Sequence, residues 1–491
     1  MEATVTTGAA PHGARHGDDY RTASFAQRRL WFLDQLAEDS SDSLLPLALR
    51  TRGPLDVPAL ERALTGVVDR HEVLRTRFTA VDGEPVPRVD GPGGAVLERT
   101  EAGSAGELFA RELGRPLDLA TQHPMRAVLA RLAPDDHLLL LVVHHIAVDG
   151  WSWDVLLREL AAGYRGEAVA PPALRYADFA RAQAERLSGP RMERLLGYWR
   201  DRLRGTAPLD LPTDRPRPRF WDGSGDVVRF TLPADLVADV DRVAREHRAT
   251  RYMLLLAVYQ ALLARCTGRT DIAVCTTMAD RGHAGTAELI GPFVNTVVLR
   301  TDLSGEPAFG ALLERVRTGV LKDLSHADAP FDHVVRAVGG ERDLSRHPLA
   351  QASFTLLNTA QRPVVLPGLE AELVAPPLTG TTMDVFLDLS LRADGGIAAR
   401  LQYATALFDA GTMHRFASAY TGLLRAVLDD PRTPVAELAR RLEPLPDGSA
   451  PDGSAPHAAG VRPEARWSTA PDRPAGPAPA VAVAGDPGAP A

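Results

Sequence analysis

The sequence has few cysteines, and their spacing excludes two classes of site. Its 491 residues include only two, Cys266 and Cys275, which lie nine positions apart without a second pair. That spacing is typical of neither a zinc knuckle nor a redox motif. We therefore expect two reduced thiols in the core of a cytoplasmic protein.

Long apolar runs and an excess of positive charge are also absent. The longest apolar runs, Leu138–Val143 and Met253–Val258, are too short to span a bilayer. The net charge of −8 provides no basic surface for a nucleic acid or an anionic membrane. Met1–Gly17 has no apolar core and does not resemble a signal peptide. With 45% hydrophobic and 24% charged residues, the composition is that of a soluble globular protein.

One stretch combines a buried strand with chemically active side chains. The apolar run Leu138–Val143 predicts a strand, and it is followed by His144 and His145. Asp149 comes four residues later, before Gly150, a residue type that can adopt positive φ. A helical pattern over 153–164 follows, and a strand that ends in a polar turn before a helix is a common position for catalytic residues.

Three interpretations of the histidine pair remain open from the residues alone. Neighbouring strand side chains point to opposite faces, so His144 and His145 are not expected to act together. One of them could be a general base, because imidazole titrates near neutral pH. Two histidines and a carboxylate could bind a metal, although opposed faces make this awkward. Backbone hydrogen bonds could also simply satisfy both rings.

The run His144–Gly150 matches the HHxxxDG signature of non-ribosomal peptide synthetase condensation domains, which are relatives of chloramphenicol acetyltransferase. Six further stretches resemble the family's core motifs in the same order along the chain. The most similar are Ser24–Phe32 (SxAQxRLW), Arg70–Phe78 (RHExLRTxF), Tyr176–Ala180 (YxDFA) and Ile290–Arg300 (IGxFVNT). The resemblance extends from about Ser24 to Leu428.

The sixth and seventh motifs depart from the family pattern. His326–Asp332 resembles HQDYPFE, but Ala327 and Ala329 replace glutamine and tyrosine, and aspartate replaces the final glutamate. In Arg342–Leu349, His347 stands where the family usually has asparagine. These changes leave the fold prediction intact and the substrate open.

The resemblance implies an α/β fold with mixed sheets, in which two chloramphenicol acetyltransferase-like lobes form a V. We expect a disordered lead over 1–19, a first lobe over 20–205, a second lobe over 206–440 and a disordered Pro/Ala/Gly-rich tail over 441–491. A long charged helix over 173–204 should close the first half, and an extended proline-rich connector over 211–218 should join the two lobes. Because no adenylation domain or carrier motif follows Leu428, we expect a free-standing enzyme.

The resemblance also implies a reaction. Carrier proteins would bring 4'-phosphopantetheine arms to a tunnel between the lobes, where an acyl thioester meets an acceptor amine. No cofactor bound by this chain and no metal are required. His145 is the expected base or positioning residue, and the backbone N–H of Gly150 could stabilise the oxyanion.

Other residues receive supporting roles. His144 is expected to be structural. Asp149 should hold the loop in shape by pairing with Arg70 or Arg75, since a buried carboxylate needs a partner. We expect four polar side chains near the substrate channel: Asn295, Thr296, Trp151 and Ser152.

Several other functions remain as alternatives. An acyltransferase could use a soluble amine or alcohol as the acceptor, the latter giving an ester. A catalytically silent module could recruit a carrier protein or another partner. Epimerisation is disfavoured because the epimerase glutamate motif has no counterpart here, and heterocyclisation domains have aspartates in place of the histidine pair.

Overall fold

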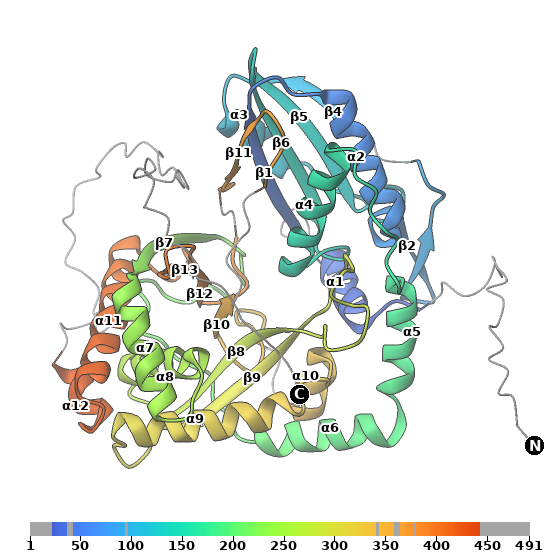
Figure 1. The fold of residues 1–491 in the computed structure, drawn as a ribbon. Helices are drawn as coiled ribbons and strands as arrows, with labels where there is room; N and C mark the ends of the chain where they lie inside the picture. The colour runs from blue at the N-terminus through green and yellow to red at the C-terminus, as the bar shows by residue number, and fades with distance from the viewer. Residues whose placement is uncertain are drawn as a thin grey trace, which may run out of the picture.

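The computed structural model describes residues 22–36, 43–93, 97–339, 343–357, 364–377 and 380–441. Within these ranges there are two large sheets, each covered by helices, and one two-stranded hairpin (Figure 1). The mixed α/β architecture expected from the sequence is therefore confirmed. The lead over 1–19 and the tail from 442 onward lie outside the described residues.

The first lobe is built on a five-stranded sheet of order β11-β1-β6-β5-β4, in which β11 is Glu370–Val374. Its central strand β6 is buried on both faces, which explains its unbroken apolar sequence. Leu139 and Leu141 pack under α2 and α4, whereas Leu138 and Leu140 pack against α3. The elements are α1 (Phe25–Leu36), β1 (Leu44–Arg52), α2 (Val57–Arg70), β2 (Thr76–Val81), β3 (Glu84–Val89), β4 (Leu97–Glu101), α3 (Ala105–Leu113), β5 (Met125–Ala133), β6 (Asp136–His144) and α4 (Gly150–Tyr164).

The second lobe has a six-stranded sheet of order β7-β13-β12-β10-β8-β9. Helix α8 is apolar along most of its length because α7, α9 and α11 surround it. The elements are β7 (Gly225–Leu232), α7 (Ala234–Glu246), α8 (Arg251–Thr267), β8 (Asp271–Ala279), β9 (Val294–Asp302), α9 (Phe309–Leu324), α10 (Phe331–Val338), β10 (Ala352–Leu357), β12 (Val385–Leu391), β13 (Ile397–Ala404), α11 (Ala410–Asp429) and α12 (Val435–Arg440).

The two lobes repeat one core. In both, one strand pairs antiparallel with a neighbour on each side, and one of these neighbours has a parallel partner on its far side. The strands with two antiparallel neighbours are β6 and β13, and each ends in a three-residue turn before a helix, α4 or α11. In these turns Ala147 N–H donates to His144 O and Leu407 N–H donates to Ala404 O. The histidine motif of the first lobe therefore has a backbone counterpart in the second.

Two helices rather than one join the lobes. The expected helix over 173–204 is divided into α5 (Tyr176–Arg186) and α6 (Gly189–Arg202). Gly189 has a φ of +52° and Pro190 follows it, so the helical backbone cannot continue through this point. In Figure 1, α5 runs down from the first lobe and α6 crosses below the second.

Two segments from the second half of the chain return to the first lobe. Strand β11 (Glu370–Val374) lies within the range expected for the second lobe, but it pairs antiparallel with β1 at the edge of the first sheet. The segment 280–293 passes from β8 to the N-terminus of α4 before β9 begins. No described helix is both long and apolar enough to cross a membrane.

Candidate functional site

The histidine pair lies in a tight turn at the end of β6. His144 N–H donates to Pro124 O at 2.8 Å, and His145 N–H donates to Ser43 O at 2.8 Å. Each bond joins the turn to a neighbouring chain segment, before β5 or before β1. Backbone hydrogen bonds to two neighbouring segments therefore help to hold the turn at both histidines.

The ring of His145 has one nitrogen bound to the backbone and the other unbound. Nδ1 lies 2.7 Å from Val148 O, and a carbonyl can only accept, so Nδ1 carries the proton. Nε2 consequently has the lone pair, and no described residue hydrogen-bonds to it. Burial lowers the pKa of His145 from its ordinary value of 6.5, against opposing contributions from the Val148 carbonyl and Asp149. The ring is therefore a neutral proton acceptor at neutral pH.

His144 points elsewhere and is fully buried. Its Nε2 lies 3.1 Å from the Asp34 carboxylate on α1, and its Nδ1 accepts from Ile146 N–H at 3.0 Å. The rings of the two histidines therefore make different contacts and share no hydrogen-bond partner among the described residues.

Asp149 connects the turn, α4 and segment 280–293. Asp149 is the N-cap residue of α4, and its carboxylate accepts from the N–H and the hydroxyl of Ser152. It also accepts from Phe293 N–H at 3.1 Å and pairs with the Arg281 guanidinium at 2.9 Å. Both members of this ion pair are buried, with side-chain exposures of 1% and 7%.

The expectation that Asp149 pairs with Arg70 or Arg75 is wrong. Arg70 instead pairs with Glu159 at 2.8 Å, and the same carboxylate lies 3.0 Å from His71 Nε2. Arg75 donates to the backbone carbonyl of Asp90. These arginines join α2, α4 and the β2–β3 hairpin, whereas Arg281 reaches Asp149 from the second half of the chain.

The four expected channel residues divide into different roles. Ser152 is fully buried and bonds to Asp149 and Gly291, so the expectation that it lines a channel is wrong. Trp151 is 44% exposed and donates to Ala287 O. Asn295 donates to two carbonyls, of Ala327 and Ala329, and accepts from Phe331 N–H at the start of α10. Its amide is therefore fully used in holding α10.

Thr296 forms a contact between the lobes. Its hydroxyl accepts from the Arg29 guanidinium at 3.0 Å, so α1 touches β9. The Arg29 guanidinium carbon lies 4.9 Å from the ring centroid of Phe331, and His347 stacks on the same ring at 5.4 Å. Arg29 was not among the site residues expected from the sequence, although the motif Ser24–Phe32 contains it. Together these residues form a polar and aromatic cluster between α1 and the second lobe.

Gly150 opens α4 at an exposed position. It is the first helical residue and has no positive φ, so its lack of a side chain does not serve a left-handed turn here. A Cβ added there would meet no atom within 4 Å. The unpaired N–H groups of a first helical turn attract negative charge, so the end of α4 beside His145 is suited to an oxyanion.

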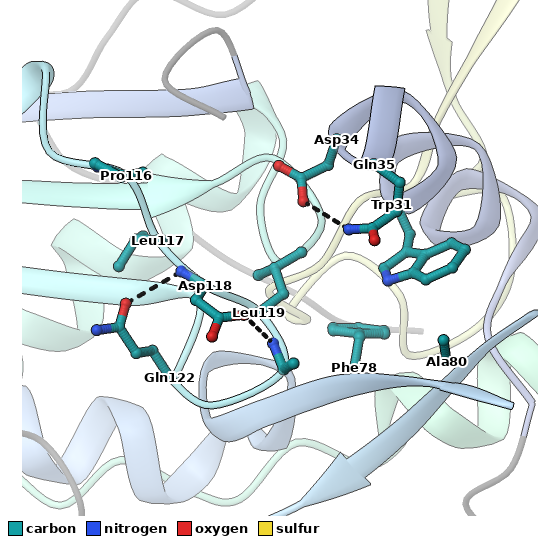
Figure 2. Close-up of a pocket in the computed structure, with 11 residues that line it drawn as sticks. Trp31, Asp34, Gln35, Phe78, Ala80, Pro116, Leu117, Asp118, Leu119 and Gln122 are labelled. Atoms are coloured by element: carbon teal, nitrogen blue, oxygen red, sulfur yellow. Dashed lines mark hydrogen bonds between the residues drawn. The ribbon is translucent and has the colours of Figure 1, made fainter. Parts of the chain in front are cut away.

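A cavity of about 430 Å³ lies between α1, β2 and the segment after α3 (Figure 2). Trp31, Asp34 and Gln35 of α1 form one wall, and Phe78 of β2 forms another. The remaining wall is the segment 116–122 after α3. Asp34 is thus shared between this cavity and His144.

Metal-ligating residues do not cluster in the described ranges, where no group of three histidine, cysteine, aspartate or glutamate side chains could hold an ion. The site offers an imidazole base, a helix N-terminus and a set of fixed backbone groups. These are the parts needed to accept a proton and stabilise a developing negative charge.

The family model described as "Condensation domain" matches residues 18–442. The chain belongs to the condensation domain family. A probable non-canonical nonribosomal peptide synthetase of Salinispora arenicola, CymA, is 40% identical over 425 residues, which cover 83% of this chain and 5% of that protein. Malpinin synthetase of Mortierella alpina is 37% identical over 428 residues, or 84% of this chain and 6% of that protein. This condensation domain therefore spans only a small part of the curated relatives that it matches.

Solved structures with more than 25% identity share the fold of this chain. The X-domain from teicoplanin biosynthesis, in complex with OxyB, has a TM-score of 0.79 and 30% identity, and the match covers 88% of this chain and 99% of that one. SgcC5 from Streptomyces globisporus, solved with (R)-(-)-1-(2-naphthyl)-1,2-ethanediol and sucrose, has a TM-score of 0.68 and 28% identity over 84% and 100% of the two chains. The expected pair of chloramphenicol acetyltransferase-like lobes is confirmed.

Proposed function

We propose that this condensation domain joins a carrier-bound acyl or aminoacyl thioester to an acceptor amine, with His145 as the base or positioning residue. The observation that carries the proposal is the state of the His145 ring. Val148 O fixes the proton on Nδ1, and Nε2 keeps its lone pair without a partner among the described residues. A neutral imidazole held in one tautomer is a competent proton acceptor.

The chemistry follows from an activated donor. The acceptor nitrogen attacks the thioester carbon, a C–N bond forms, and the C–S bond breaks when the tetrahedral intermediate collapses. His145 Nε2 takes the proton that the nitrogen loses, and that proton leaves with the thiolate. The main tasks of the protein are therefore to align the two reactants and to exclude water.

The negative oxygen of the intermediate would lie at the N-terminus of α4. Gly150 N–H belongs to the first turn of that helix, and the missing side chain leaves open space around it. Helix-terminal N–H groups are effective because they are already oriented before charge develops. Asp149 keeps this end in place by capping the helix.

Carrier proteins would deliver the reactants on phosphopantetheine arms. Beside the cluster between the lobes, α1 exposes three large apolar side chains: Phe32, Leu33 and Leu36, with exposures of 58%, 45% and 67%. An exposed apolar group of this size commonly marks a protein contact. We propose this face of α1 for carrier docking.

The test is to incubate the protein with acyl-loaded carriers, offering the acceptor either free or carrier-bound, and to identify products by intact mass. Wild-type protein should form an amide, and His145→Ala should lower the rate at least ~100-fold because the base is lost. His137→Ala provides a matched control, since His137 lies at the opposite end of β6. Circular dichroism should show the same fold for all three proteins. Equal turnover by His145→Ala would contradict the assignment.

A soluble alcohol or amine is the second candidate acceptor. The similar SgcC5 structure contains an aryl ethanediol, which carries hydroxyl groups. If this alternative holds, a free alcohol or amine should give product with a loaded donor carrier, while a carrier-bound amine should not.

A silent recruitment module is the third candidate. The similar teicoplanin X-domain was solved in complex with OxyB. The ready tautomer of His145 favours catalysis over this alternative. If recruitment is the function, no loaded carrier should be turned over, and binding of a carrier or a partner enzyme should survive His145→Ala.

A further inference from the structure

Asp34 is a buried carboxylate that the proposed reaction does not use. It lies in the last turn of α1, and its side chain is 7% exposed. Its Oδ1 lies 3.1 Å from His144 Nε2, and its Oδ2 accepts a longer bond from Gln35. A buried carboxylate is costly unless it accepts hydrogen bonds, so the contact with the His144 ring is the one that satisfies it.

The second nitrogen of His144 contacts the backbone of the catalytic turn. Nδ1 lies 3.0 Å from Ile146 N, which can only donate, so Nδ1 has the lone pair and Nε2 has the proton. The His144 ring thus connects a carboxylate on α1 to the peptide group directly after His145. Removing the carboxylate would leave Nε2–H buried without an acceptor and free the ring to change tautomer.

We propose that Asp34 is a positioning residue for the reaction. By accepting the Nε2 proton of His144, it holds the tautomer whose Nδ1 accepts from Ile146, and this fixes the turn that presents His145. The inference rests on the proposed function, because it assigns Asp34 a part in the geometry of that base. Small displacements of a catalytic group can lower a rate ~100-fold.

The cavity shown in Figure 2 makes the proposal testable. Asp34 lies on its wall opposite the segment 116–122, so a side chain of different shape at position 34 has room. Asp118 lies on that other wall and provides a matched control. Its carboxylate accepts from Thr121 and Ala120 and does not contact His144.

The experiment compares Asp34→Asn, Asp34→Leu and Asp118→Leu by kcat and KM. The asparagine of the first variant can still accept from Nε2–H through its amide oxygen, so kcat should stay within ~3-fold of wild type. Asp34→Leu cannot accept, and kcat should fall ~10- to 100-fold while KM changes less than ~3-fold. Asp118→Leu should match wild type. Equal losses in both Asp34 variants, or none in Asp34→Leu, would overturn the proposal.

A double variant separates positioning from general loss of stability. If Asp34 acts through His144, then Asp34→Leu should add little further loss of kcat to His144→Ala. Additive losses would show that Asp34 acts by another route. Thermal melts of the same proteins give their stability independently of the rate.

A measurement that needs no turnover tests the role of Asp34 separately from the proposed reaction. In protein labelled with ¹⁵N-histidine, NMR reports which ring nitrogen carries the proton, and His144→Ala and His145→Ala identify the signals. Wild type and Asp34→Asn should show His144 protonated at Nε2. Asp34→Leu should change the signals of both rings, and unchanged rings in Asp34→Leu would refute the proposal even if no substrate is found.

Discussion

At the scale of single residues, two buried imidazoles, His145 and His347, lose proton affinity for the same reason. Burial lowers the pKa of both His145 and His347, because a charged ring is poorly solvated there. The neighbours differ. Asp149 partly opposes the shift at His145, whereas the Arg29 guanidinium lowers the pKa of His347 further, to about 4. His347 is therefore neutral throughout the physiological range.

This difference predicts acid sensitivity at His347. The unfolded chain protonates this residue near its ordinary pKa of 6.5 and the folded protein near 4, so stability that is complete above pH 6.5 is lost as the pH falls toward 4. At pH 5 the loss amounts to about 2 kcal/mol. His347→Asn, which restores the residue usual in the family, should reduce the fall in Tm between pH 7 and pH 5. Equal acid dependence in both proteins would contradict the argument.

At the scale of elements, one carboxylate joins α4 to the segment that leads into β9. Asp149 caps the helix and pairs with Arg281 in surroundings that exclude water. Removing one member of a buried ion pair leaves the other charge uncompensated, which costs more than the pair contributes. The N-terminus of α4, the turn and the crossing segment are therefore coupled through this side chain.

Asp149→Ala should destabilise the protein by about 3–5 kcal/mol, because Arg281 remains buried without its partner. Loss of the helix cap adds about 1 kcal/mol. Urea denaturation of Asp149→Ala, Arg281→Met and the double variant measures the coupling. The double variant should be less destabilised than the sum of the single ones, and additive losses would contradict a direct pairing.

Sequence patterns predicted much of the fold and of the site, and failed where distant segments meet. The apolar run before His144 predicts a buried strand, and the motif resemblance predicts two lobes. Asp149 was expected to be buried and paired, but no local pattern identifies Arg281, which is 132 positions away. Asp34 was missed for the same reason, since its partner His144 is 110 positions away.

The break between α5 and α6 had a visible signal. Gly189 and Pro190 interrupt the charged helical pattern, and the combination is a strong helix breaker. Strand β11 had no such signal in the sequence, because five residues of mixed polarity become a strand only where a sheet edge is available. β1 provides that edge from the other end of the chain.

At the scale of the whole molecule, the repeated core explains why this protein has one histidine turn and two lobes. The turn after β13 has the same backbone pattern as the turn after β6, but Thr405 occupies the place of His145. Thr405 bonds to the hydroxyl of Ser224 in its own lobe. The second lobe therefore keeps the framework without the base, and it contributes the crossing segments that complete the first lobe.

Strand β11 is one of these crossing segments, and its loss should loosen the first lobe selectively. It pairs with β1 over five positions, and Arg52 pairs with Glu372 at 3.0 Å at one end. Glu372→Pro removes the ladder donor opposite Arg50, together with the ion pair to Arg52, so amide exchange along β1 should rise while β7 and β13 keep their protection. Val365→Pro, before the strand, provides the matched control and should leave exchange along β1 unchanged. Hydrogen–deuterium exchange with mass spectrometry measures both variants beside wild type. Equal loss of protection in both lobes would mean that they unfold as one unit rather than as two joined by β11 and the segment anchored at Asp149.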